Sequence, residues 1–152
     1  MSPEEITNFV QNTENIGTSG QPMKEQFKNI AELGYCSVIN LAMPDSDNAI
    51  PEEGSIVTSL GMNYFHIPVP FDSPTVEHLR QFIGIMESVD SDKTWVHCAV
   101  NARVSAFMFH YLSKVKGYSE GASKSPVIMR WEPKMDDVWK SFMKLTKDDI
   151  GL

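Results

Sequence analysis

The chain has 152 residues, of which 41% are hydrophobic and 22% charged, and its formal net charge is −7. This composition excludes an intrinsically disordered chain, and the length predicts a single domain over residues 1–152 with a core of its own. The acidic balance argues against nucleic-acid binding, because contacts with phosphate backbones need clustered Lys and Arg.

Short β-rich runs alternate with helical patterns along the chain, which is typical of βαβ units on a parallel sheet. In the first half of the chain the predicted elements are a strand at 15–18, a helix at 23–33 closed by Gly34, a buried strand at 36–41, and a helix at 52–60.

The same alternation continues in the second half of the chain. The predicted elements are a strand at 64–69, a helix capped by Ser73 with Pro74 in its first turn, a strand at 94–97, a strongly amphipathic helix at 104–115, and a final helix at 135–143. Residues 119–131 stay ambiguous because Pro126 interrupts a helical pattern. The order predicts an α/β sandwich, with a central, mainly parallel sheet flanked by helices, and such a fold alone names no function.

The two cysteines are not expected to pair. Cys36 falls at the start of one predicted strand and Cys98 at the end of another, so parallel strands would hold the thiols too far apart for a disulfide. Free thiols fit a reducing compartment. The N-terminal residues lack the basic start and apolar stretch of a signal peptide, and no run suits a membrane span. We expect a cytoplasmic protein without membrane association, although a chain trimmed of its leader would look the same.

The most informative segment is residues 95–105, Trp-Val-His-Cys-Ala-Val-Asn-Ala-Arg-Val-Ser. It predicts a strand, a tight loop opened by Cys98, and a helix that begins near Arg103. Backbone N–H groups at a helix N-terminus bind anions, and the same field beside an Arg favours a thiolate. A thiolate facing a cradle for a tetrahedral oxyanion is what attack on a phosphate ester requires, and an Arg can bind two of the oxygens at once.

This segment resembles the signature of the protein tyrosine phosphatase superfamily, which is His-Cys, five residues, Arg, and then Ser or Thr. Three further segments come in the expected order: the turn at 19–22, the strand Val-Ile-Asn-Leu at 38–41, and Tyr-Phe-His-Ile-Pro-Val at 64–69. Together they are similar to the compact dual-specificity branch, in particular the bacterial phosphatase-like domain that also occurs fused to β-lactamase-like hydrolases. The resemblance covers residues 14–117.

The loop departs from that signature in its spacing. Only four residues separate Cys98 from Arg103, so either the loop is one residue short or Arg103 lies one position early. Ser105 lies seven residues after Cys98, where the family has its hydroxyl. This favours the second alternative, in which Val104 fills the usual Arg position. The loop also lacks glycine, and Asn101 is the residue best able to adopt a positive φ in its place.

The resemblance implies a cysteine-dependent phosphatase that hydrolyses a phosphate monoester through a phosphocysteine intermediate. Cys98 would be the nucleophile, Arg103 would bind the phosphate, Ser105 would stabilise the leaving thiolate, and Asp72 would act as general acid and then as base. The loop backbone that would bind the substrate phosphate belongs to Ala99, Val100, Asn101, Ala102 and Val104.

The general acid has more than one candidate in the sequence. Departure of an alkoxide needs a proton, and Asp72 follows the predicted strand at 64–69 on a loop. Asp72 could instead simply precede the next helix, and Asp45 or Asp47 is then the second choice. We expect His97 to orient the loop through hydrogen bonds rather than to transfer protons.

The resemblance implies no cofactor, and the remaining histidines, His66, His78 and His110, lack metal-ligand spacing, so no metal is predicted. The expected partner is a phosphorylated protein or small molecule. The sequence is silent on the oligomeric state. Two other functions stay open. A pseudophosphatase would hold a phosphorylated or other anionic ligand without efficient turnover. Sulfur transfer of the rhodanese type would also use a cysteine on a strand-loop-helix, although Ala99-Val100 matches such loops poorly.

Overall fold

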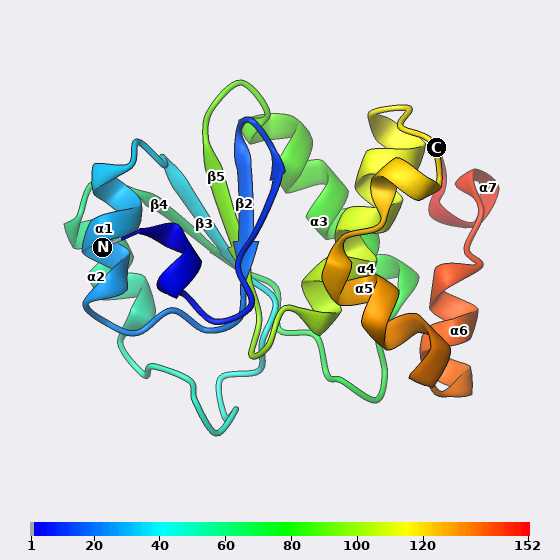
Figure 1. Cartoon of the computed structure of the whole chain (residues 1–152), viewed down its shortest axis with the longest axis horizontal. Coiled ribbons are helices and arrows are strands. Elements are labelled where there is room, and N and C mark those ends of the chain that lie inside the picture. The colour runs from blue at the N-terminus through cyan, green and yellow to red at the C-terminus, as the bar shows by residue number, and fades with distance from the viewer. Residues whose placement is uncertain (1) are drawn as a thin grey trace.

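A computed structural model of the chain describes residues 2–152. Five strands form one sheet in the order β1-β2-β5-β3-β4, in which only β1 is antiparallel to its neighbour (Figure 1). The strands are β1 (Val10–Thr13), β2 (Ile16–Ser19), β3 (Ser37–Asn40), β4 (Asn63–His66) and β5 (Thr94–His97). The central, mainly parallel sheet predicted from the sequence is therefore confirmed.

Helices cover both faces of the sheet, with α1 and α2 on one side and the others on the opposite side (Figure 1). The helices are α1 (Gln26–Glu32), α2 (Glu53–Ser59), α3 (Val76–Val89), α4 (Ala102–His110), α5 (Pro126–Trp131), α6 (Asp137–Met143) and α7 (Lys147–Ile150). A π-helical turn, Tyr111–Val115, continues α4. The predicted sandwich of helices around the sheet is thus confirmed as well.

The central strand β5 places the site residues. It lies between β2 and β3 and is parallel to both. Side chains alternate across a strand, so Trp95 and His97 face α1 and α2, whereas Val96 faces the core beneath α3 and α4. Cys98, the next residue in this alternation, joins the same core as Val96.

One predicted helix start is wrong, and one segment that the sequence left ambiguous is a helix. The helix expected from Ser73 and Pro74 begins at Val76, because the Thr75 hydroxyl accepts the N–H of His78 and caps it. Pro126 does not interrupt a helix but begins α5, with the Ser125 hydroxyl accepting from Ile128. Proline fits the first turn of a helix because its missing N–H has no partner there.

Strand boundaries also differ from the predictions. β1 was missed and pairs with β2 as a hairpin, so the strand predicted at 15–18 is the second strand of the sheet. β4 ends at His66 rather than at residue 69. The N–H groups of Ile67 and Val69 still donate to the carbonyls of Asn40 and Leu41, respectively. Pro68, which lies between them, has no backbone N–H to donate.

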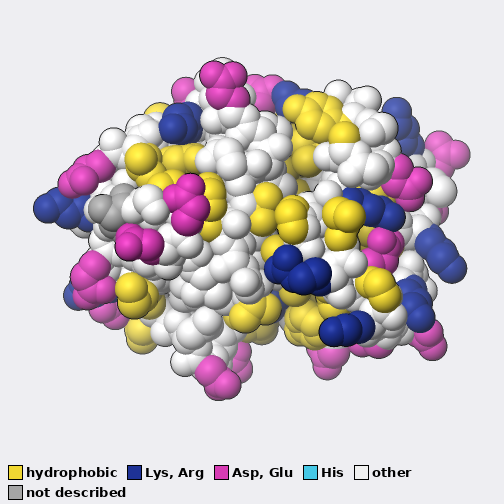
Figure 2. Space-filling model, viewed as in Figure 1, with side chains coloured by type: hydrophobic (Ala, Val, Ile, Leu, Met, Phe, Trp, Pro, Cys, Tyr) yellow, Lys and Arg dark blue, Asp and Glu magenta, His cyan; other side chains and the backbone are white. Residues whose placement is uncertain are grey.

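Charged side chains mix over the face in Figure 2, with Lys and Arg gathered mainly over the half formed by the later helices. None of the helices formed by residues 2–152 is both long and apolar enough to cross a membrane.

Candidate active site

Cys98 directly follows β5 and has no exposed surface. Its backbone N–H donates to the carbonyl of Ser19 at 3.4 Å, which ties the start of the loop to β2. Cys36 is exposed at the other end of the sheet, so both thiols are free, as expected. The nucleophile predicted from the sequence therefore lies at the carboxyl end of the central strand, where ligands bind in open α/β sheets.

Three successive carbonyls of the loop accept hydrogen bonds from groups around it. The donors are His97 Nδ1 for Cys98 (3.1 Å), Gln21 N (3.0 Å) and Asn48 Nδ2 (3.1 Å) for Ala99, and Asn8 Nδ2 (2.9 Å) for Val100. In a trans peptide the C=O and the following N–H point in opposite directions. The N–H groups of residues 99 and 100 are therefore each turned away from an anchored carbonyl. The N–H of Asn101 instead faces the carbonyl of Ser19, because Val100 forms an antiparallel bridge with Gly20.

Asn101 adopts the positive φ, 72°, that the missing glycine made necessary. Its side-chain amide donates to the carbonyl of Asn8 at 2.8 Å and to the Thr18 hydroxyl at 3.3 Å, and it does not cap α4. Within residues 2–152, the backbone N–H groups of residues 102–104 donate to no protein acceptor. The first turn of α4 thus presents the free N–H groups that an anion site needs.

Arg103 lies in that first turn with 6% of its surface exposed. Its Nη1 donates to the carbonyl of Val69 at 2.8 Å, and its guanidinium carbon lies 5.7 Å from the centre of the Phe71 ring. Among the described residues, Nε has no acceptor and no carboxylate forms an ion pair with this side chain. The buried positive charge is therefore without a counter-ion.

The two residues after Arg103 point elsewhere. Val104, which fills the usual Arg position on the favoured alignment, is fully buried in the core. The Ser105 hydroxyl donates to the carbonyl of Ala102 at 2.6 Å. In the free protein, Ser105 therefore stabilises the first turn of α4.

Asp72 lies on an exposed turn between β4 and α3, where Ser73 N donates to the carbonyl of Pro70 at 3.1 Å. The turn is fixed from behind by Trp139 of α6, whose indole Nε1 donates to the carbonyl of Phe71 at 2.7 Å. The Phe71 and Trp139 rings also pack 5.5 Å apart. Since Arg103 contacts Val69 and Phe71, the residues before Asp72 lie against the start of α4.

Sequence analysis missed Glu53, which lies behind the loop with 3% of its surface exposed. Its carboxylate accepts from His97 Nε2 at 2.6 Å and from Gln21 Nε2 at 2.6 Å. Burial raises the pKa of Glu53, but the hydrogen bonds from His97, Gln21 and Tyr64 and the charge of His97 outweigh it, so the pKa lies below its usual value. Two adjacent Glu residues at a helix start, Glu52 and Glu53, give no signal of this contact in the sequence.

His97 has a partner at each ring nitrogen. Nδ1 faces the carbonyl of Cys98, and Nε2 faces the carboxylate of Glu53. His97 therefore orients the loop through hydrogen bonds, as expected.

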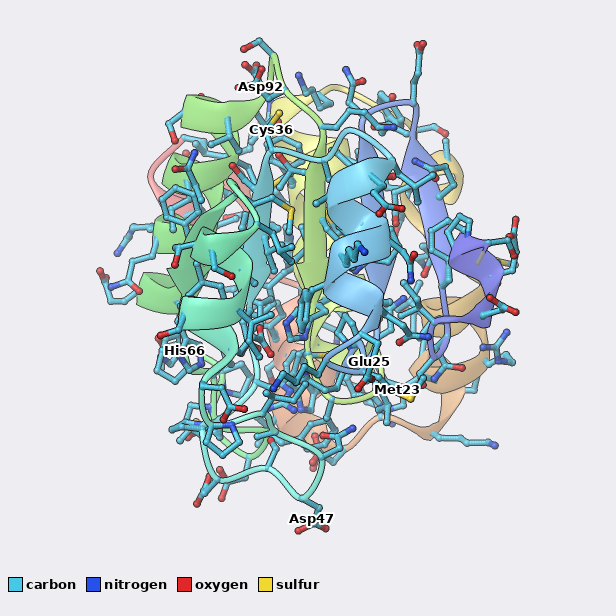
Figure 3. The ribbon with its side chains drawn as sticks, turned by 90° about the vertical axis from the view of Figure 1, so that its left-hand side faces the viewer. Met23, Glu25, Cys36, Asp47, His66 and Asp92 are labelled. Atoms are coloured by element: carbon cyan, nitrogen blue, oxygen red, sulfur yellow. The ribbon has the colours of Figure 1, made fainter. Side chains whose placement is uncertain are left out.

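A cavity of about 540 Å³ opens beside the loop. Gln21 and Asn48, which both donate to the carbonyl of Ala99, are part of its wall. The remaining wall is mostly apolar and carries one cation and one carboxylate: Thr7, Pro22, Met23, Lys24, Glu25, Ala49, Ile50 and Pro51. Figure 3 shows Met23, Asp47 and His66 at this end of the sheet.

In residues 2–152, no three His, Cys, Asp or Glu side chains gather into a group that could hold a metal ion. The histidines that the sequence set aside are used in the fold. His66 and His110 bond to the carbonyls of Ala42 and Phe142 through Nε2, and His78 contacts the cap of α3.

Among curated proteins, the β-lactamase hydrolase-like protein of Xylella fastidiosa is 30% identical over 105 residues. The match covers 67% of this chain but only 24% of that protein, so the chain spans about a quarter of the length of the curated relatives it matches. No protein-family model matches the chain.

Two solved structures extend the likeness over nearly the whole chain. A candidate phosphatase of the DUF442 group from Shewanella putrefaciens CN-32 is 28% identical, with a TM-score of 0.85, and the match covers 98% of this chain and 97% of that one. The core catalytic domain of the PP-IP phosphatase SIW14 from S. cerevisiae, in complex with citrate, is 17% identical, with a TM-score of 0.75 over 96% and 90% of the two chains. The second likeness concerns the fold alone.

Proposed function

The chain belongs to the protein tyrosine phosphatase-like superfamily, and we propose that it hydrolyses a phosphate monoester through a phosphocysteine intermediate on Cys98. This proposal also takes residues 1–152 as one phosphatase-like domain. The substrate is a phosphorylated protein or small molecule.

The observation that carries the proposal is the unpaired charge of Arg103. A buried guanidinium is normally paired, because burial of an unpaired charge costs several kcal/mol. Arg103 is almost fully buried, lacks a carboxylate among the described residues, and keeps Nε without an acceptor. It lies five positions after Cys98, at the start of α4. A phosphate dianion bound here supplies the missing counter-charge.

The loop backbone supports the same ligand. The N–H groups of residues 99 and 100 are turned away from anchored carbonyls, and those of residues 102–104 begin α4 without acceptors. The bonded carbonyls hold the backbone of the loop in place. Preorganised donors of this kind are the largest contribution to stabilising charge in a transition state.

The reaction has two steps. The Cys98 thiolate attacks phosphorus, the P–O bond of the ester breaks, and Asp72 donates a proton to the departing alkoxide. Asp72, now a carboxylate, then takes a proton from water as the water attacks the phosphocysteine, which releases phosphate and restores the thiolate. Asp45 and Asp47 remain the alternatives to Asp72.

Ser105 contributes to the second step only if its hydroxyl changes its hydrogen-bond partner. Its hydroxyl donates to Ala102 in the free protein, so it must exchange that bond for the Cys98 sulfur in order to stabilise the leaving thiolate. The loop residues Ala99, Val100, Ala102 and Val104 contribute backbone N–H groups rather than side chains, whereas the N–H of Asn101 faces the carbonyl of Ser19.

The cavity beside the loop favours a phosphate on an apolar carrier. Its wall includes Met23 and Ile50 and only one cation, Lys24. Phe71 and Val100 add exposed apolar surface, 45% and 50% respectively. A polyanionic substrate would need several Lys or Arg side chains here, so we expect aryl phosphates to be better substrates than inositol polyphosphates.

One observation favours a second function, oxyanion binding without turnover. Cys98 has no exposed surface and packs in the apolar core, as an inert cysteine would. Two measurements separate the two functions: hydrolysis of p-nitrophenyl phosphate and calorimetric binding of inorganic phosphate.

The experiment uses Cys98→Ser, with Cys36→Ser as the matched control. We expect hydrolysis by the wild type and by the control, and none by Cys98→Ser, which still binds phosphate. Arg103→Met should weaken phosphate binding and lower the rate by about 10²–10³, as for loss of one transition-state contact. Binding without hydrolysis in the wild type would select the pseudophosphatase. A wild type that neither binds phosphate nor hydrolyses the ester would refute both functions.

A further inference from the structure

Residues 2–9 run beside the Cys98 loop before the chain enters β1 (Figure 1). Asn8 of this segment makes two hydrogen bonds with the loop, although 92 positions separate it from Val100. Its side-chain Nδ2 donates to the carbonyl of Val100 at 2.9 Å, and its backbone carbonyl accepts from Nδ2 of Asn101 at 2.8 Å. The reaction described above assigns no part to Asn8.

Asn8 and Asn101 both hold an unusual backbone conformation. Within residues 2–152 they are the two non-glycine residues with a positive φ, at 51° and 72°. This region is unfavourable for L residues, although Asn tolerates it better than most. Such conformations persist only where the surrounding structure holds them, and they gather at active sites. In this chain the two residues are bonded to each other, which ties both of them to the loop.

The peptide group between Val100 and Asn101 is held at both ends. Its carbonyl accepts from Asn8, and its N–H faces the carbonyl of Ser19 at the end of β2. This peptide directly precedes the first turn of α4. Its orientation therefore affects where the free N–H groups of residues 102–104 point.

The N-terminal segment does not need the side chain of Asn8 in order to stay in place. Ile6 is 1% exposed and belongs to the core on the α1 and α2 side of the sheet. On the other side of Asn8, the ring of Phe9 stacks on that of Trp95 with their centres 5.4 Å apart. The backbone of Asn8 is thus fixed between two anchored residues, and its amide is left to act on the loop.

Gly20 shows how closely the N-terminal segment, β2 and the loop meet. Its N–H donates to the carbonyl of Thr7 at 2.7 Å. A Cβ at this position would lie 2.6 Å from the carbonyl oxygen of Ala99 and 3.0 Å from the side chain of Thr7. The end of β2 therefore joins the N-terminal segment to the loop with no space for a side chain between them.

We propose that Asn8 is a positioning residue for the Cys98 loop. Its amide fixes the peptide between Val100 and Asn101, and its carbonyl holds the side chain of Asn101. The glycine-free loop thereby keeps the shape in which its N–H groups can bind phosphate. The value of this shape for hydrolysis rests on the proposed phosphatase function, whereas the order of the loop can be measured without any substrate.

NMR relaxation of the phosphate-free protein tests whether Asn8 orders the loop. Asn8→Gly removes the amide, keeps the carbonyl and adopts a positive φ easily, and Asn8 is exposed, so the core stays intact. The matched control is Asn15→Gly, an exposed position in the turn between β1 and β2, at the opposite end of the sheet. We expect the order parameters of residues 99–102 to be about 0.85 in the wild type and the control and below about 0.6 in Asn8→Gly. Equal order parameters in the three proteins would overturn the proposal.

Hydrolysis of p-nitrophenyl phosphate tests whether that order serves the reaction. The kcat of Asn8→Gly should fall about tenfold with a smaller change in KM, because misaligned N–H groups lose more contact with the transition state than with the substrate. Asn8→Asp keeps the size of the side chain but places an acceptor opposite the carbonyl of Val100, so its kcat should fall at least as far. Asn15→Gly should keep the kcat of the wild type.

The outcomes separate this proposal from the proposed function. A bond that only stabilised the fold would lower the urea midpoint of Asn8→Gly and leave its kcat unchanged. An unchanged kcat in either Asn8 variant of an active wild type would therefore overturn the proposal. A wild type without hydrolysis would refute the phosphatase function, and the order parameters of the loop would still decide whether Asn8 positions it.

Discussion

His110 should make the stability of the protein fall steeply between pH 7 and pH 5. The ring is fully buried in α4, and its Nε2 donates to the carbonyl of Phe142 at 2.8 Å, while Nδ1 has no partner among the described residues. Burial lowers the pKa of His110 from its ordinary value of 6.5 to about 4. The folded protein therefore keeps this ring neutral at pH values at which the unfolded chain has bound a proton.

The magnitude follows from the difference between the two pKa values. Each unit is worth about 1.4 kcal/mol, so the loss approaches about 3.4 kcal/mol once the pH is below 4. Between pH 7 and pH 5 it amounts to about 2 kcal/mol. The stabilisation is complete above the unfolded pKa and is lost as the pH falls through the window between the two values.

Urea unfolding at pH 7 and pH 5 measures this loss, with His110→Gln as the comparison. Glutamine places an Nε2 donor near the carbonyl of Phe142 but does not titrate. With an m-value of about 2 kcal/mol/M, we expect the midpoint of the wild type to fall by about 1 M more than that of the variant. Carboxylates such as Glu53 titrate equally in both proteins and cancel. Equal pH dependence in the two proteins would refute the neutral, buried state of His110.

Three further substitutions test the site. Glu53→Gln cannot accept from all three donors, so His97 should lose its fixed orientation behind the Cys98 loop and kcat should fall about tenfold, equivalent to 1.4 kcal/mol; an unchanged kcat would argue against a role for this hydrogen bond in positioning the loop. Trp139→Phe removes the hydrogen bond to the carbonyl of Phe71, worth about 1 kcal/mol, and so loosens the turn that carries Asp72. Hydrolysis of an alkyl phosphate should slow more than hydrolysis of an aryl phosphate, and an equal loss of rate would mean that the bond does not position Asp72. The free energy of unfolding of Asn101→Ala should be about 1 kcal/mol lower than that of Asn101→Gly, because both variants lose the side-chain amide but only alanine resists a positive φ. Equal urea midpoints of the two variants would contradict this.

Periodicity in the sequence was enough to predict four of the five strands, including the one that directly precedes Cys98. The strand at 94–97 was predicted with its observed bounds, because four β-prone residues lie between a turn and the Cys loop. The positive φ of Asn101 was predictable too, since few residues besides glycine adopt it.

Long-range contacts explain what the sequence could not predict. Glu53 and His97 are 44 positions apart, and their hydrogen bond forms only when α2 packs against the sheet. The sequence offers two residues that could cap α3, because Ser73 and Thr75 both have side chains that favour this position. The structure shows that Thr75 is the cap, since its hydroxyl accepts from the N–H of His78. The hydrogen bond from Trp139 to Phe71 joins residues 68 positions apart, so no local pattern announces it.

The position of β5 bears on how the chain folds during synthesis. β5 is the last strand to leave the ribosome, yet it lies between β2 and β3 in the finished sheet. Until residues 94–97 emerge, the nascent chain holds two separate strand pairs, each with an unpaired inner edge. Such edges pair readily with other chains. Insertion of β5 closes both edges and brings Cys98 to the core in one event, so a truncated product that ends before β5 should aggregate rather than survive as a partly folded protein.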